Sequence, residues 1–128
     1  MPAGLLLSDD LLFGSRVTAT ARAHGLTVVT ARTPARLLEL AAADVPAAVV
    51  LDLQHPGLDL AAVVAALAAL PAPPRLVGYG SHVDADALKQ ARRLGVLAMP
   101  RSQFAARLEQ DLAGWLGRSQ GVTGEPGA

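Results

Sequence analysis

The chain has 128 residues, which is enough for one domain with its own hydrophobic core. Eleven basic and eleven acidic residues give no net charge, so general electrostatic attraction to nucleic acid or to an anionic membrane surface is not expected. Without cysteine, the chain has no disulfides, thiolate metal sites or cysteine nucleophiles. No apolar run approaches the roughly 18–20 residues that span a bilayer, and no signal peptide is recognisable, so we expect a cytoplasmic protein.

Five short apolar runs alternate with five amphipathic segments along the chain. The runs, which we predict to be buried β-strands, are residues 3–8, 26–31, 47–51, 75–79 and 96–99. The segments that follow them, which we predict to be helices, are residues 11–24, 34–44, 60–70, 84–94 and 103–116. Gly25 and Gly95 are typical residues for helix ends, and Ser102 is the predicted N-cap of the last helix.

Helical spacing predicts which sides of the helices are buried. On the first helix this side is formed by Leu12, Phe13, Val17, Ala21 and His24. On the last helix it is formed by Phe104, Leu108, Leu112, Trp115 and Leu116. Residues 61–70, AAVVAALAAL, contain no polar side chain. The outer face of this helix is therefore either lined by small alanines or covered by a partner or a second copy of the chain.

The alternation of buried strands and helices predicts parallel β-α-β units with right-handed crossovers. Five such units predict an α/β, flavodoxin-like (βα)5 doubly wound parallel sheet with strand order 2-1-3-4-5 in three α/β/α layers. We expect residues 1–116 to form the single domain. Residues 117–128, with four glycines and few apolar residues, are predicted to be a flexible C-terminal tail.

Polar residues follow three strands that are neighbours in this order. The aspartates are Asp9 and Asp10 after the first strand and Asp52 after the third, and the fourth strand is followed by Gly80, Ser81 and His82. Since the C-terminal ends of these strands share one crevice, the carboxylates would repel one another unless a proton or a divalent cation lay between them. A cluster of oxygen ligands suits Mg²⁺ rather than zinc. The alternative is that the aspartates only cap the helices that follow them.

From Leu5 to Leu116 this arrangement resembles the receiver domain of response regulators in two-component phosphorelay signal transduction. Its most specific piece is residues 52–59, DLQHPGLD. The resemblance implies that Asp52 stands at the phosphoacceptor position, where a histidine kinase delivers a phosphoryl group. It also implies that Mg²⁺ is bound by Asp52, the backbone carbonyl of Gln54 and one or both of Asp9 and Asp10.

The chain departs from the receiver pattern at two supporting positions. Receivers carry Thr or Ser after the fourth strand, where this chain has Gly80 or Ser81. Receivers end the fifth strand with Lys-Pro, where this chain has Met99 before the proline, unless a shorter loop brings Arg101 near the lysine position. Phosphoryl transfer depends on positioning and electrostatic stabilisation, so losing a hydroxyl and a cation would cost about 2–4 kcal/mol each. We therefore favour an atypical receiver, or pseudo-receiver, over an ordinary switching receiver.

The predicted function is that of a stand-alone, non-enzymatic signalling domain that acts through protein–protein contacts. Its partners would be a histidine kinase, a downstream protein or a second copy of the chain. One alternative is a dimerisation or interaction module that is independent of phosphorylation. Another is a flavin- or nucleotide-binding protein, which is disfavoured because Asp9 and Asp10 would repel a phosphate. His82 and Arg101 are candidates for the rim of the site, whereas His55 is predicted to be a solvated loop residue.

Overall fold

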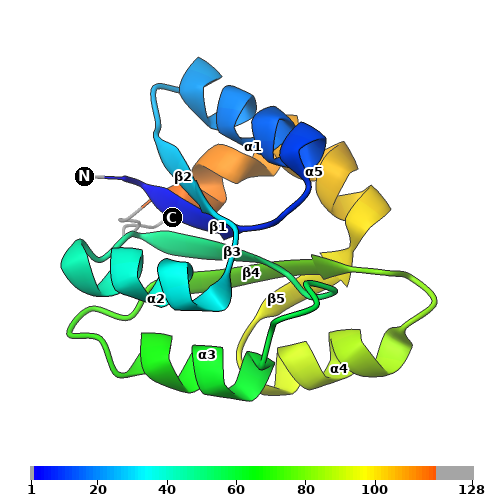
Figure 1. The fold of residues 1–128 in the computed structure, drawn as a ribbon. Coiled ribbons are helices and arrows are strands. Elements are labelled where there is room, and N and C mark those ends of the chain that lie inside the picture. The colour runs from blue at the N-terminus through cyan, green and yellow to red at the C-terminus, as the bar shows by residue number, and fades with distance from the viewer. Residues whose placement is uncertain (1, 118–128) are drawn as a thin grey trace, which may run out of the picture.

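The computed structural model describes residues 2–117, which form a parallel sheet covered by helices on both faces (Figure 1). The strands are β1 (Gly4–Leu7), β2 (Val28–Ala31), β3 (Ala48–Asp52), β4 (Arg75–Gly80) and β5 (Leu97–Pro100). The helices are α1 (Leu11–Ala23), α2 (Pro34–Ala43), α3 (Leu60–Ala68), α4 (Ala85–Arg93) and α5 (Arg101–Leu116). The strands are parallel and lie in the order β2-β1-β3-β4-β5, which confirms the predicted flavodoxin-like sheet. Most of the predicted tail, residues 118–128, lies outside the described residues.

The two faces of the sheet are covered by different helices and filled by different residues. Helices α1 and α5 lie on one face, and α2, α3 and α4 lie on the other (Figure 1). Under α1 and α5 is a core that includes Phe13, Tyr79, Phe104 and Trp115, which are all the aromatic residues of the chain; we call it the aromatic core. The buried residues under α2, α3 and α4 are Leu, Val and Ala alone, and we call them the aliphatic core.

Side-chain caps fix where most of the helices begin. The side chains of Asp10, Thr33, Asp59 and Asp84 each accept a hydrogen bond from a backbone N–H in the first turn of the helix that follows. The prediction that Ser102 caps the last helix is wrong, because β5 leads directly into α5 and Arg101 is already helical. The residue at that N-cap position is Pro100, which makes no side-chain hydrogen bond.

The predicted burial of the helices is confirmed except at the start of α1 and at its end. All five residues predicted for α5 are buried, as are Phe13 and Val17 of α1. Leu12 was predicted on the buried side and is 87% exposed, because the Asp10 cap sets the helical register so that Phe13 faces the sheet. His24 is exposed, and its ring Nδ1 lies 3.0 Å from the carbonyl of Thr20.

Helix α3 buries its larger side chains and leaves alanines on the outside. Val63, Val64 and Leu67 pack against the sheet, whereas the exposed positions of the helix are all alanine. Small side chains therefore account for an outer face without polar residues. A partner or a second copy on this face stays a prediction. None of the helices within residues 2–117 is long and apolar enough to cross a membrane.

Candidate functional site at the carboxyl end of the sheet

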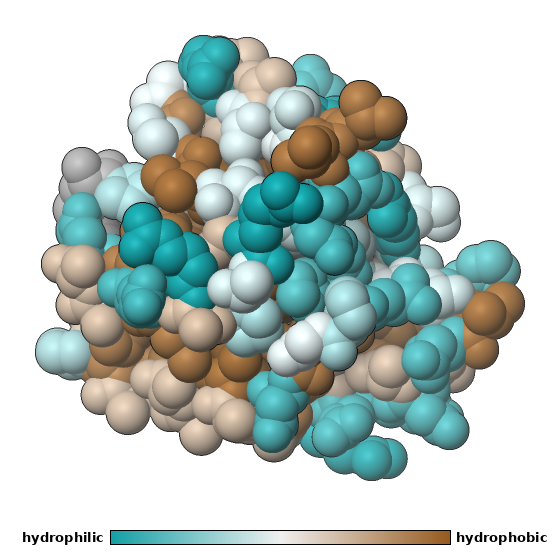
Figure 2. Space-filling model, in the orientation of Figure 1, coloured by the Kyte–Doolittle hydropathy of each residue, from teal (hydrophilic) through white to brown (hydrophobic). Residues whose placement is uncertain are grey.

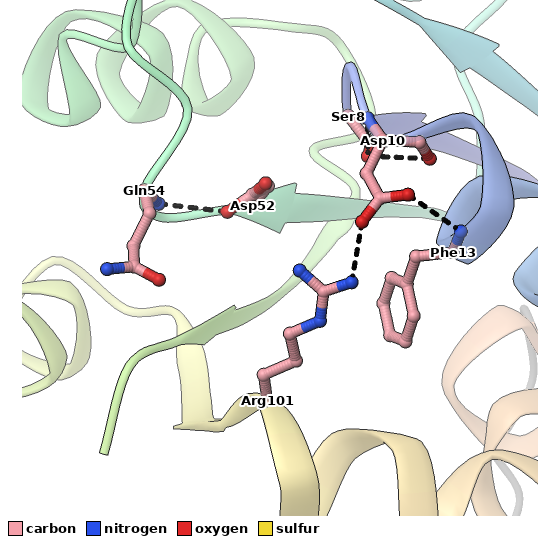
Figure 3. A network of polar contacts seen from close by, with 6 residues as sticks. All are labelled: Ser8, Asp10, Phe13, Asp52, Gln54 and Arg101. Atoms are coloured by element: carbon pink, nitrogen blue, oxygen red, sulfur yellow. Dashed lines mark hydrogen bonds and ion pairs between the residues drawn. The ribbon is translucent and has the colours of Figure 1, made fainter. Parts of the chain in front are cut away.

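The predicted acidic residues meet at the carboxyl end of the sheet, joined there by an arginine from α5. Asp52 is the last residue of β3 and lies in register with Tyr79 of β4. Asp10 caps α1 directly after β1, and Arg101 is the first residue of α5. In Figure 3 the Asp10 carboxylate and the Arg101 guanidinium point toward each other, with Asp52 beside them at the end of its strand. Asp9, the residue before Asp10, is exposed.

Both carboxylate oxygens of Asp10 have partners. Its Oδ1 accepts a hydrogen bond from the Phe13 backbone N–H at 3.0 Å, and its Oδ2 accepts one from the Arg101 guanidinium at 2.7 Å. These two hydrogen bonds, led by that from Arg101, lower the pKa of the Asp10 carboxyl. Asp10 is thus a helix cap, as the alternative sequence interpretation held, and also one half of an ion pair.

Arg101 is held by aromatic rings as well as by Asp10. Its guanidinium carbon lies 4.2 Å from the centre of the Phe13 ring and 5.9 Å from that of Tyr79. A guanidinium over an aromatic face is attracted by the ring quadrupole. The side chain keeps 44% of its surface exposed, so it lies at the edge of the aromatic core and faces solvent on one side.

Asp52 has a different environment from Asp10. Its Oδ1 accepts a hydrogen bond from the Gln54 backbone N–H at 2.9 Å, whereas the Gln54 side chain is exposed and points away from the group (Figure 3). Partial burial raises the pKa of the Asp52 carboxyl, and the Gln54 N–H and the positive charge of Arg101 oppose that rise. Burial therefore disfavours the ionised carboxylate, and the charge of Arg101 compensates in part.

This donor set does not fit a magnesium ion as it stands. Within residues 2–117, no three His, Cys, Asp or Glu side chains lie close enough together to hold a metal ion. Magnesium needs oxygen ligands in near-ideal octahedral geometry, and each oxygen of Asp10 already accepts a hydrogen bond, one of them from a cation. The assignment of Asp9, Asp10, Asp52 and Gln54 as Mg²⁺ ligands stays a prediction from the resemblance.

Of the two candidate residues after β4, Gly80 has no hydroxyl and the Ser81 hydroxyl accepts a hydrogen bond within its own turn. Gly80 ends β4 and is buried, and a methyl group built on it would lie 3.5 Å from Leu53, at ordinary contact distance. The Ser81 hydroxyl accepts a hydrogen bond from the Val83 backbone N–H at 3.2 Å, within its own turn. His82 is exposed on this loop.

The end of β5 carries no cation inside the strand. The Met99 side chain is 2% exposed and packs in the aromatic core, in register with Tyr79. Of the two residues that the sequence left as candidates for the lysine position, only Arg101 brings a positive charge to the acidic group. It does so from the first turn of α5 and not from the strand.

His55 is not solvated, which corrects the sequence interpretation. Its side chain is buried between two loops, with Nε2 2.7 Å from the Arg32 carbonyl. Its Nδ1 accepts a hydrogen bond from the Gly57 backbone N–H at 3.1 Å. These two contacts fit the neutral ring with the proton on Nε2. His55 thereby ties the loop after β3 to the loop after β2, which fixes the segment that follows Asp52.

Two residues that the sequence did not single out also belong to this site. Ser8 is 1% exposed, and its hydroxyl accepts a hydrogen bond from the Asp10 backbone N–H at 3.1 Å. Tyr79 is 1% exposed, and its hydroxyl has no hydrogen-bond partner among the described residues. Burial, together with the charge of Asp52, raises the pKa of the Tyr79 hydroxyl, which stays neutral. A tyrosine at the end of a buried strand, directly before the candidate loop, is the sequence signal that could have marked it.

No family model matches this sequence, and no curated protein matches it. Solved structures match the fold over most of the chain. A response regulator from Hahella chejuensis is 17% identical over 88% of this chain and 93% of its own, with a TM-score of 0.76. The receiver domain of NtrX from Brucella abortus is 21% identical over 88% and 97%, with a TM-score of 0.75. A response regulator receiver protein from Burkholderia phymatum is 21% identical over 95% and 100%, with a TM-score of 0.73. The predicted resemblance is confirmed at the level of the fold: this chain has the fold of response-regulator receiver domains.

Proposed function

We propose that this protein is a pseudo-receiver, a receiver-like signalling domain that acts through contacts with other proteins. The observation that carries the proposal is the environment of Asp52. The carboxylate occupies the end of β3, while Gly80 supplies no hydroxyl and Met99 no charge at the ends of β4 and β5. Phosphoryl transfer to a carboxylate depends on such positioned donors and cations, so Asp52 is a poor acceptor in this site.

The surface around the site supports an output through protein contacts. Leu11 and Leu12 in the first turn of α1 are 65% and 87% exposed, and Val83 in the loop between β4 and α4 is 79% exposed. In Figure 2 apolar surface lies over the start of α1 and over the loop between β4 and α4, with polar surface between them. Leu11 and Leu12 together form exposed apolar surface next to the Asp10 cap, which a protein partner could cover.

The proposal is tested by intact-mass spectrometry after incubation with acetyl phosphate and Mg²⁺. We expect only a trace of phosphorylated wild-type protein, and none in Asp52→Asn. Gly80→Ala is the matched control, since a methyl group at this position would lie at ordinary contact distance from Leu53 and Leu88. Its methyl group faces the aliphatic core and adds no hydroxyl to the site, so we expect the same trace of phosphorylation as in the wild type. Rapid and complete phosphorylation of wild-type Asp52 would instead identify an ordinary switching receiver.

A further inference from the structure

We propose that Arg101 is the resident cation of the acidic group at the carboxyl end of the sheet, and that it excludes divalent cations from this site. Its guanidinium makes a 2.7 Å ion pair with Asp10 and carries a positive charge that also acts on Asp52. Arg101 is the first residue of α5, so the helix fixes where its side chain begins. The inference concerns the same site as the proposed function and deepens it by stating which charge balances the aspartates.

The contacts of Asp10 explain why the arginine displaces a metal ion. Its Oδ1 already accepts from the Phe13 N–H and its Oδ2 from Arg101, so a metal ion would have to share an oxygen with one of these donors. Magnesium holds its waters firmly and is usually bound through one or two carboxylates, which gives weak affinity when one of them is unavailable. A dication beside a guanidinium is also repelled.

The position of Arg101 is maintained against an unfavourable helix dipole. The first turn of a helix has a partial positive charge, which repels a cation there. Two groups offset this repulsion: the Asp10 carboxylate and the Phe13 ring, whose centre lies 4.2 Å from the guanidinium carbon. These two contacts hold the guanidinium beside the acidic group in spite of the helix dipole.

Helix α5 contains a second arginine in similar surroundings, which supplies a matched control. Arg107 forms a 2.6 Å ion pair with Asp111 on the same helix. Its guanidinium carbon lies 5.8 Å from the centre of the Trp115 ring. Arg107→Met therefore removes one positive charge, one ion pair and one ring contact from α5 without touching the acidic group.

The experiment is a titration of the full chain with MgCl₂, followed by amide chemical shifts, with MnCl₂ as a paramagnetic probe of location. We expect no saturable shifts and no selective broadening in the wild type or in Arg107→Met. In Arg101→Met we expect magnesium to bind at least about tenfold more tightly than in the wild type, from the loss of one repelling charge. Manganese should then broaden the amides of Asp9, Asp10, Asp52 and Gln54 selectively.

Two results would overturn the inference. One is saturable magnesium binding by the wild type at the affinity of Arg101→Met, and the other is the absence of binding in both proteins. Arg101→Gln gives the same comparison should the methionine variant not fold. No phosphoryl donor is present in this titration. It therefore fails or succeeds independently of the acetyl phosphate test, so a failure here would leave the pseudo-receiver proposal intact.

Discussion

The two cores on either side of the sheet differ in composition and in what they support. The aliphatic core packs α2, α3 and α4 with branched and small side chains that can shift slightly to fill space. The aromatic core stacks Phe104 against Tyr79 with ring centres 4.8 Å apart and against Trp115 at 5.4 Å. At the edge of the aromatic core nearest the site, the Arg101 guanidinium packs over the Phe13 ring. The comparison teaches that the candidate site is built on the stacked rings of the aromatic core.

The largest expected effect comes from removing the ring at the centre of the aromatic core. We expect Phe104→Ala to lower the free energy of unfolding by about 4–5 kcal/mol, because neighbouring rings cannot collapse into the cavity. Leu67→Ala in the aliphatic core should cost about 2–3 kcal/mol, since flexible neighbours relax. Both are measured by urea unfolding followed by circular dichroism. Phe104 and Leu67 are almost fully buried, so exposure does not confound the comparison.

Equal costs for these two variants would show that the two cores respond alike and would remove the basis of the comparison. A Phe104→Ala protein that does not fold would be replaced by Phe104→Leu. This change keeps an apolar side chain in the stack, and we expect it to cost about 1–2 kcal/mol. Its thermal transition should remain cooperative.

A smaller effect is expected at the two carboxylates beside the aromatic core, whose pKa values shift in opposite directions. Burial raises the pKa of Asp52, so at neutral pH its ionised form opposes folding. Asp52→Asn should therefore be more stable than the wild type at pH 7. As the pH falls through the raised pKa, the wild type takes up a proton and recovers this stability. The difference in stability between the two proteins should vanish below the pKa of Asp52 in the unfolded chain, about 3.9.

Replacing Asp10 is expected to change stability in the opposite direction from replacing Asp52. Arg101 lowers the pKa of Asp10, so the ionised carboxylate stabilises the native state above the unfolded-state pKa. That contribution is lost as the pH falls through the lowered pKa. Asp10→Asn should accordingly be less stable than the wild type at pH 7, with thermal unfolding at several pH values as the measurement. An Asp52→Asn variant that melts below the wild type at pH 7 would contradict the sign assigned to Asp52.

The fold followed from the sequence because its signals are local. Runs of buried residues, caps such as Thr33 and Asp84, and glycines after helices each act within a few residues of the chain. The strand order then followed from the rules for parallel β-α-β units. Asp52 was placed correctly at a strand end for the same reason, since a run of buried residues stops there.

The contacts of the site could not be predicted because they join distant parts of the chain. Arg101 and Asp10 are 91 residues apart, and His55 and Arg32 are 23 residues apart. No local pattern reports on such pairs. The sequence therefore predicts an ordinary solvated loop residue at His55. In the structure each of its ring nitrogens contacts the backbone of a loop. The place of Tyr79 before the candidate loop could have marked it, but the sequence does not show that its ring packs under Arg101.

The smallest expected effect tests the register of α1 at the edge of the aromatic core. Leu11, Leu12 and Phe13 are consecutive apolar residues, so spacing alone allows either Leu12 or Phe13 to face the sheet. The Asp10 cap sets the helix so that Phe13 faces the sheet and is 8% exposed, whereas Leu12 is 87% exposed. We expect Leu12→Ser to change the free energy of unfolding by less than about 0.5 kcal/mol in urea titrations. A loss of about 2 kcal/mol or more would mean that Leu12 is buried and that the first turn of α1 is rotated, which would also take Phe13 from beneath Arg101.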